Sequence, residues 1–212
     1  MDGDCWCAPG ALEAMAADLE RHPRAVAVAG AAQTGRSREL YHRYQRDWGW
    51  VYGGLYGVRG SHVMRLRQLG IRMPVGLKGN DHFVTKLLHA PLPRTDAFER
   101  EQVVFDERAG YLFDTLSPLR PADMRIYWNR LVTYNLRQRQ IPLLDGVPLD
   151  RLPENMDEVN QEILKDLGQH RRRWHPVDQA VHRKLRRMYP TPDSAFYREG
   201  LARAPKVDVL HP

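Results

Sequence analysis

Segments with the apolar spacing of helices alternate along this chain with short apolar segments typical of strands. The clearest strand is 25–32, an uncharged run of small apolar residues that follows the first helix pattern. We expect helices at 9–22, 37–46, 61–70, 80–89 and 121–140, and strands at 25–32, 51–59, 102–106 and 109–113. Because helices and strands alternate, the sequence predicts an α/β domain with a mostly parallel sheet.

The composition changes after Ile141. A loop rich in proline, leucine and aspartate runs to Pro153, and helices are expected at 156–172 and 176–188. Prolines recur in the closing segment, which is typical of an extended tail. We therefore predict three parts: an α/β domain at 1–141, a basic helical extension at 142–189 and a proline-rich tail at 190–212.

Overall composition indicates a globular chain, with 42% apolar and 27% charged residues. The longest uncharged apolar run, 25–32, is much shorter than the about 20 residues of a membrane-spanning helix, and no secretory signal pattern opens the sequence. We expect a cytoplasmic protein. Cys5 and Cys7 are separated by one residue, which suits neither an easy disulfide nor a complete zinc site, so we interpret them as small apolar residues beside Trp6.

The chain is basic, with a net charge of +6 carried by 27 arginines and 5 lysines. Positive charge is concentrated between Lys165 and Arg187, where only Asp166 and Asp178 are acidic. This stretch is either a solvated helix face or a surface for phosphate groups, anionic lipid or nucleic acid. No interleaved aromatic platform accompanies these arginines, so sequence-specific recognition of nucleic acid is not expected. One hypothesis is therefore a non-catalytic basic module that binds a polyanion or an anionic membrane surface.

Two carboxylates open the chain in the sequence Asp2-Gly3-Asp4. On an extended segment, residues two apart point to the same side, so both side chains could bind one hard divalent cation through oxygen. The alternative is an acidic turn that caps the following helix. The short motif alone does not decide between these two interpretations.

Later segments add weight to the first interpretation when they are taken in order. The glycine-interrupted aromatic segment 51–59 is followed by a helix pattern and then by 73–88, which includes Asn80-Asp81. This succession, over residues 1–115, resembles the later half of a family 2 glycosyltransferase with the GT-A fold. The resemblance implies an inverting transfer of sugar from a nucleotide-diphosphate donor to a hydroxyl of a glycan or lipid-linked acceptor, as in polysaccharide biosynthesis.

The resemblance also implies roles for individual residues. Asp2 and Asp4 match the pair that contacts the nucleotide sugar and its divalent metal, Mg²⁺ or Mn²⁺. Gly54 and Arg59 match a strand element that lines the donor and acceptor pocket. Asp81 matches the aspartate that acts as the catalytic base.

This chain also departs from the family. Asn80 stands where the family has the first acid of a pair, which leaves the base in place but removes a neighbouring negative charge. His82 and the loop 76–79 are candidates for shaping the substrate pocket. Without the family, Asp81 would be interpreted as a carboxylate favoured by the dipole of its helix. The family's nucleotide-binding first half precedes the Asp-x-Asp pair, so this sequence would be a fragment, a gene called from an internal start, or a protein that has lost its donor site. We expect an N-terminally truncated enzyme with little or no transferase activity by itself.

Overall fold

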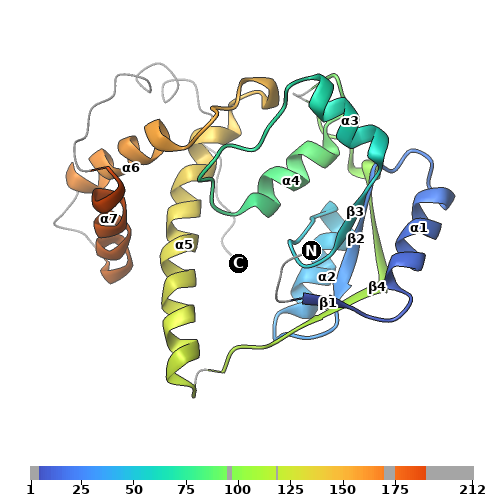
Figure 1. Ribbon diagram of the computed structural model, residues 1–212, viewed down its shortest axis with the longest axis horizontal. Coiled ribbons are helices and arrows are strands. Elements are labelled where there is room, and N and C mark those ends of the chain that lie inside the picture. The colour runs from blue at the N-terminus through green and yellow to red at the C-terminus, as the bar shows by residue number, and fades with distance from the viewer. Residues whose placement is uncertain (1–4, 95–96, 118, 170–174, 190–212) are drawn as a thin grey trace. The chain divides into compact units, whose positions relative to one another are not determined.

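The computed structural model describes residues 5–94, 97–117, 119–169 and 175–189, which form two compact units (Figure 1). The first unit contains the chain up to Arg72 together with Asn80–Ser117, and the second contains Met73–Gly79 and the chain from Pro118. The change of unit after Ser117 lies upstream of the boundary expected after Ile141. The predicted tail at 190–212 lies outside the described residues.

A four-stranded sheet forms the centre of the first unit, in the order β1-β4-β2-β3. Its strands are β1 (Cys5–Cys7), β2 (Ala27–Ala32), β3 (Tyr56–Val58) and β4 (Val103–Phe113). With helices on both faces, the unit is α/β, as predicted. Only β2 and β4 pair in parallel, whereas β1 pairs antiparallel with β4 and β3 pairs antiparallel with β2. The prediction of a mostly parallel sheet is therefore wrong.

The reversed direction of β3 follows from the segment before it. We expected one strand over 51–59, but residues 49–55 run back along the sheet outside the named strands. Val51 packs in a core cluster with Ala27, and the carbonyl of Leu55 accepts a 3.0 Å hydrogen bond from the backbone N–H of Gly30. The chain thus reaches the carboxyl end of β2 before β3 begins, and β3 then returns antiparallel to β2.

The two strands predicted at 102–106 and 109–113 form one strand of 11 residues, β4. A bulge lies in the middle of this strand. Gly30 is paired with Asp106, but the next residue of β2, Ala31, is paired with Gly110. The three intervening residues of β4 bend the strand out of regular pairing.

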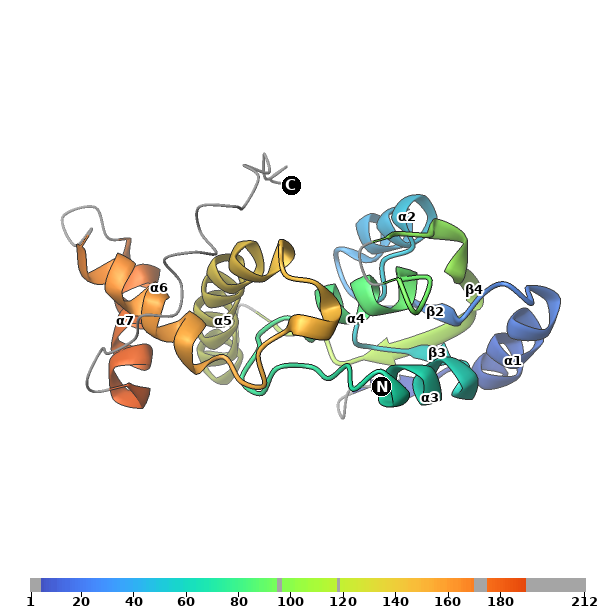
Figure 2. The ribbon, with the colours of Figure 1, turned by 90° about the horizontal axis from the view of Figure 1, so that it is seen from above.

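All six residues of β2 are buried. One apolar cluster packs on each of its two faces. Val28 and Ala32 belong to the cluster that includes Met15 of α1 (Ala11–Arg21), whereas Ala27 and Ala29 belong to the other cluster. The remaining helices of this unit are α2 (Arg38–Trp48), α3 (Gly60–Gln68) and α4 (Asn80–His89), with a 3₁₀ turn at Arg100–Gln102. Figure 2 shows α1 on one side of the sheet and α2 and α4 on the other. The small side chains of β2 allow helices to approach closely on both sides.

The second unit is helical. It contains α5 (Pro121–Asp145), α6 (Asp157–Gln169) and α7 (Pro176–Met188), with a 3₁₀ turn at Leu149–Arg151. Helix α5 was expected to end at Gln140 but continues through Pro142 to Asp145. Gln140 is fully buried and fixes this end of the helix, because its amide donates to Asn160 Oδ1 at 2.7 Å and accepts from the backbone N–H of Lys78 at 2.8 Å. Within the described residues, no helix is both long and apolar enough to cross a membrane.

Candidate functional site

The predicted base, Asp81, lies in the first turn of α4, directly after Asn80, the first residue of that helix. The Asp81 side chain is half-buried, and its Oδ1 accepts a 3.0 Å hydrogen bond from the backbone N–H of His82. The Asp81 carbonyl accepts a 2.8 Å hydrogen bond from Thr85 Oγ1, which also accepts from the backbone N–H of Val51 at 3.0 Å. Thr85 therefore fixes the start of α4 against the segment that precedes β3.

A row of half-buried rings extends from the start of α4 along that segment. The ring of His82 lies 5.4 Å from that of Trp50, Trp50 is stacked at 6.4 Å from Tyr52, and Tyr52 lies 4.5 Å from Tyr41 of α2. These distances are centroid separations, and all lie within the range of favourable aromatic contacts. Sequence reasoning identified His82 but not the other three. The alternation of Trp50 and Tyr52, two residues apart on an extended segment, was the available signal.

Gly54 lies two residues beyond Tyr52, at the turn into β3, and is buried. A Cβ atom built on Gly54 would lie 2.1 Å from Cε2 of Tyr111, so a side chain does not fit there. Tyr111 is paired with Cys7 of β1 and with Ala32, the last residue of β2. Gly54 therefore lies at the carboxyl end of the parallel pair β2 and β4, where open α/β sheets commonly bind ligands.

The predicted metal ligands Asp2 and Asp4 lie outside the described residues. The described chain starts at Cys5, which is paired with Phe113 at the same end of β4. Cys5 and Cys7 are not joined in a disulfide, and both are half-buried. In the part of the chain that the structure describes, no three histidine, cysteine, aspartate or glutamate side chains gather as a metal site would require.

Arg59 lies at the other end of β3 and has a structural role. Its guanidinium donates to the backbone carbonyls of Ala25 at 2.6 Å and of His22 at 3.2 Å, and also to that of Leu19. These carbonyls belong to the end of α1 and the segment that follows it, so Arg59 ties α1 to the start of β2. His82 begins the row of rings and Asp81 precedes it on α4, whereas Gly54 packs against Tyr111 and Arg59 against the end of α1. The loop 76–79, also a candidate, belongs to the second unit.

A polar hollow of about 280 Å³ lies beside α2 at the carboxyl end of β2. His42 in its lining is held by a 2.9 Å contact between Nε2 and the carbonyl oxygen of Ala32. Arg38 and Arg46 also line it, but each pairs with a glutamate: Arg38 with Glu39 at 3.1 Å and Arg46 with Glu107 at 2.6 Å. This hollow contains none of the residues predicted from the sequence, and its arginines are already paired with carboxylates.

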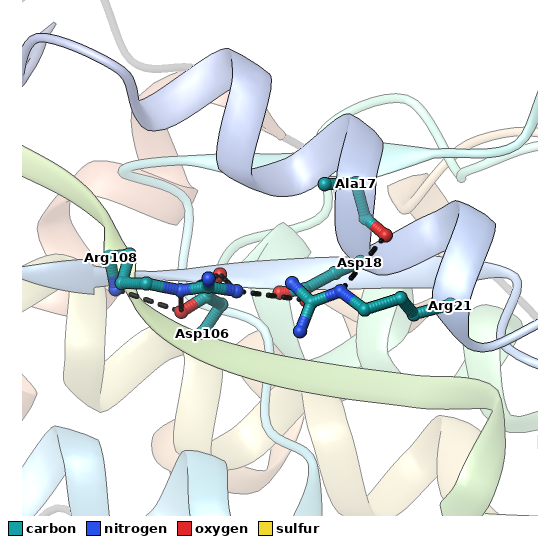
Figure 3. A network of polar contacts seen from close by, with 5 residues as sticks. All are labelled: Ala17, Asp18, Arg21, Asp106 and Arg108. Atoms are coloured by element: carbon teal, nitrogen blue, oxygen red, sulfur yellow. Dashed lines mark hydrogen bonds and ion pairs between the residues drawn. The ribbon is translucent and has the colours of Figure 1, made fainter.

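Two buried carboxylates, Asp18 of α1 and Asp106 of β4, form a network with arginines (Figure 3). Arg108 Nη2 bridges them, at 2.8 Å from Asp106 Oδ2 and 3.1 Å from Asp18 Oδ1, and Arg21 also pairs with Asp18. Burial raises the pKa of Asp18, and its hydrogen bond with Asp106 and the charge of Asp106 raise that pKa further. Burial also opposes the charge on Asp106, but hydrogen bonds from Arg108 and Asp18 lower the pKa of Asp106 to about 2. The network links α1 to the bulge of β4.

The basic surface predicted between Lys165 and Arg187 is described only in part, because Arg171, Arg172 and Arg173 lie outside the described residues. Of the rest of the cluster, Lys165 lies on α6, and Arg183, Lys184, Arg186 and Arg187 lie on α7. Burial, and then the nearby charge of Lys78, lower the pKa of Lys184.

No protein-family model, no curated protein and no solved structure matches this chain.

Proposed function

We propose that this chain is part of an inverting glycosyltransferase, which transfers a sugar from a nucleotide-diphosphate donor to a hydroxyl of a glycan or lipid-linked acceptor. The observation that supports this proposal is the position of Asp81. Its carboxylate is held in the first turn of α4, and a row of half-buried rings begins at the next residue, His82. Flat apolar rings offer a surface on which a sugar can lie. A carboxylate at the end of such a surface is placed to accept a proton from a bound hydroxyl.

In the proposed reaction, Asp81 accepts the proton of the acceptor hydroxyl. At the same time, the oxygen of that hydroxyl forms a bond to the anomeric carbon of the donor. The bond from that carbon to the diphosphate breaks in the same step, and one displacement inverts the configuration of the carbon. Asn80, the neighbour of Asp81, adds no second negative charge to the site. The proposal assigns Mg²⁺ or Mn²⁺ to Asp2 and Asp4, where the ion would offset the charge of the leaving diphosphate.

This function depends on a donor-binding segment, which the family resemblance places before the Asp-x-Asp pair. A direct test compares the 212-residue chain with a chain extended by the reading frame encoded upstream of Met1. We expect turnover of a sugar nucleotide by the extended chain and little or none by the shorter one. The transferase proposal is wrong if the upstream frame encodes no alternating strands and helices. It is also wrong if the extended chain neither hydrolyses a sugar nucleotide nor transfers its sugar.

A second candidate is the non-catalytic basic module, which binds a polyanion or an anionic membrane surface. The observation that favours it is that Arg183, Lys184 and Arg187 make no ion pair with a carboxylate among the described residues. Binding through such charges releases counterions, so retention on heparin should fall steeply as salt is raised. Failure to bind both heparin and anionic vesicles at low salt would contradict this candidate. Both candidates are compatible with a cytoplasmic protein at a membrane periphery, which is the location we propose.

A further inference from the structure

A hollow of about 590 Å³ lies between α5 and α7 within the second unit. Its apolar lining includes Trp128 and Val132 of α5 and Met188 of α7. Its charged lining is basic and comes from one face of α7, namely Arg183, Lys184 and Arg187, while Asn129 and Thr133 of α5 add neutral polar groups. The hollow therefore combines an aromatic wall with three positive charges.

Within the described ranges, no carboxylate pairs with these charges. Arg139, on the same helix as Trp128, pairs with Asp178 at 2.8 Å and with Asp166 at 3.6 Å. In contrast, the three basic residues of the hollow have no carboxylate partner in the described ranges, and the only hydrogen bond from Arg183 there goes to the backbone carbonyl of Gln179. A concave surface with uncompensated positive charge favours an anionic group, and Arg in particular suits the oxygens of a phosphate.

Apolar side chains continue from the hollow along the exposed face of α5. Met124, Trp128 and Leu131 follow each other at intervals of four and three residues, which places them on one side of the helix. Their exposed fractions are 53%, 43% and 52%, and Met188 at the end of α7 is 55% exposed. Tryptophan next to apolar and basic side chains is typical of helices that lie in the boundary between phospholipid headgroups and acyl chains.

We infer that this hollow and the adjoining face of α5 bind the surface of an anionic phospholipid bilayer. Lipid phosphates bind to Arg183, Lys184 and Arg187, while Trp128 and Met188 enter the headgroup region. The inference rests on the second function proposed above, the basic binding module, and names its partner and its site. A nucleic acid or a soluble polyanion would contact the charges but would leave Met124 and Leu131 in water, so the exposed apolar side chains favour a bilayer.

The test is cosedimentation of the full chain with phosphatidylcholine vesicles, with and without phosphatidylglycerol. We expect binding only to vesicles that contain phosphatidylglycerol. Changing Arg183, Lys184 and Arg187 together to Gln should lower the partition coefficient by about five-fold per charge, on the order of 100-fold in all. The matched control changes Arg65, Arg67 and Arg72 to Gln, which removes the same charge from exposed positions of the first unit. The control should lose far less binding.

Trp128→Ala separates a bilayer from other polyanions. It should weaken vesicle binding and leave retention on heparin unchanged, and Leu131→Ser provides a second variant with the same expected result. The lipid inference is overturned if the chain binds heparin but no vesicle, if both triple variants lose binding equally, or if neither apolar change weakens vesicle binding. Binding to neither heparin nor vesicles overturns the basic module as well. A dimer in solution that Trp128→Ala dissociates, without vesicle binding, assigns this face to a second copy instead.

Discussion

Asp106→Asn should destabilise the first unit by about 2 kcal/mol at neutral pH. Asp106 is 7% exposed and accepts hydrogen bonds from the backbone N–H of Arg108 at 2.9 Å and from its Nη2 at 2.8 Å. Lowering the pKa of this carboxyl from 3.8 to about 2 corresponds to about 2 kcal/mol of stability while the group is ionised. Asparagine keeps the shape and one acceptor oxygen but carries no charge, so this contribution is lost.

The sign of the pH dependence follows from the direction of the pKa shift. Because the pKa of Asp106 is lower in the folded protein than in the unfolded chain, its stabilisation is complete above about pH 4 and disappears as the pH falls to about 2. The difference between the wild type and Asp106→Asn should therefore shrink over the same range. Urea unfolding followed by circular dichroism at a series of pH values measures it.

Glu107→Gln is the matched control for this experiment. Glu107 is the next residue of β4, and its pair with Arg46 is exposed, with 59% and 52% of the two side chains accessible. Such surface pairs contribute at most about 1 kcal/mol. Equal losses for the two variants, or a loss for Asp106→Asn that does not change between neutral and acidic pH, would refute the role assigned to the buried network.

Three further predictions concern buried positions of the first unit. Gly54→Ala should lower the free energy of unfolding, measured by urea titration, by about 1–3 kcal/mol because the added methyl group would overlap the ring of Tyr111. The control is Gly57→Ala, whose methyl group would meet nothing closer than 3.8 Å and which should lower that free energy by less. Asp18→Asn should leave stability at neutral pH unchanged or raised, since the pKa of Asp18 is raised and its ionised form is disfavoured by burial; a loss as large as that of Asp106→Asn would contradict this. Burial lowers the pKa of His89, so melting temperature should fall as the pH decreases from about 7 to about 5, because protonation then favours the unfolded chain. A melting temperature that rises over that interval would contradict it.

Local patterns in the sequence predicted the helices and the α/β class well. They did not predict strand direction, because the return of residues 49–55 along the sheet leaves no periodic signal separate from β3. They also predicted the end of α5 too early, at Gln140. Pro142 removes a backbone donor, but the burial of Leu144 and the hydrogen bonds of Gln140 keep the helix intact to Asp145. Packing and side-chain hydrogen bonds decided both features.

The candidate site was predictable to a similar extent. The position of Asp81 in the first turn of a helix followed from local sequence, and the structure agrees with it. Arg59 was predicted to line the substrate pocket, but its guanidinium donates to backbone carbonyls, which no local sequence pattern identifies as its partners. The pairing of Asp18 with Asp106 also joins residues far apart in the chain, in a network with Arg108. Contacts of this kind become visible only when the fold is known.

The most direct test of the proposed transferase is the turnover of Asp81→Asn in the chain extended upstream of Met1, measured together with its melting temperature. Loss of the general base should lower turnover by about 10² or more with donor affinity nearly kept. Asn80→Asp, in the same turn of α4, should leave turnover intact. A helix-terminal role alone would change only stability, by about 1 kcal/mol. We therefore expect a large loss of turnover with a small change in melting temperature, and an Asp81→Asn enzyme with unchanged turnover would contradict the catalytic assignment.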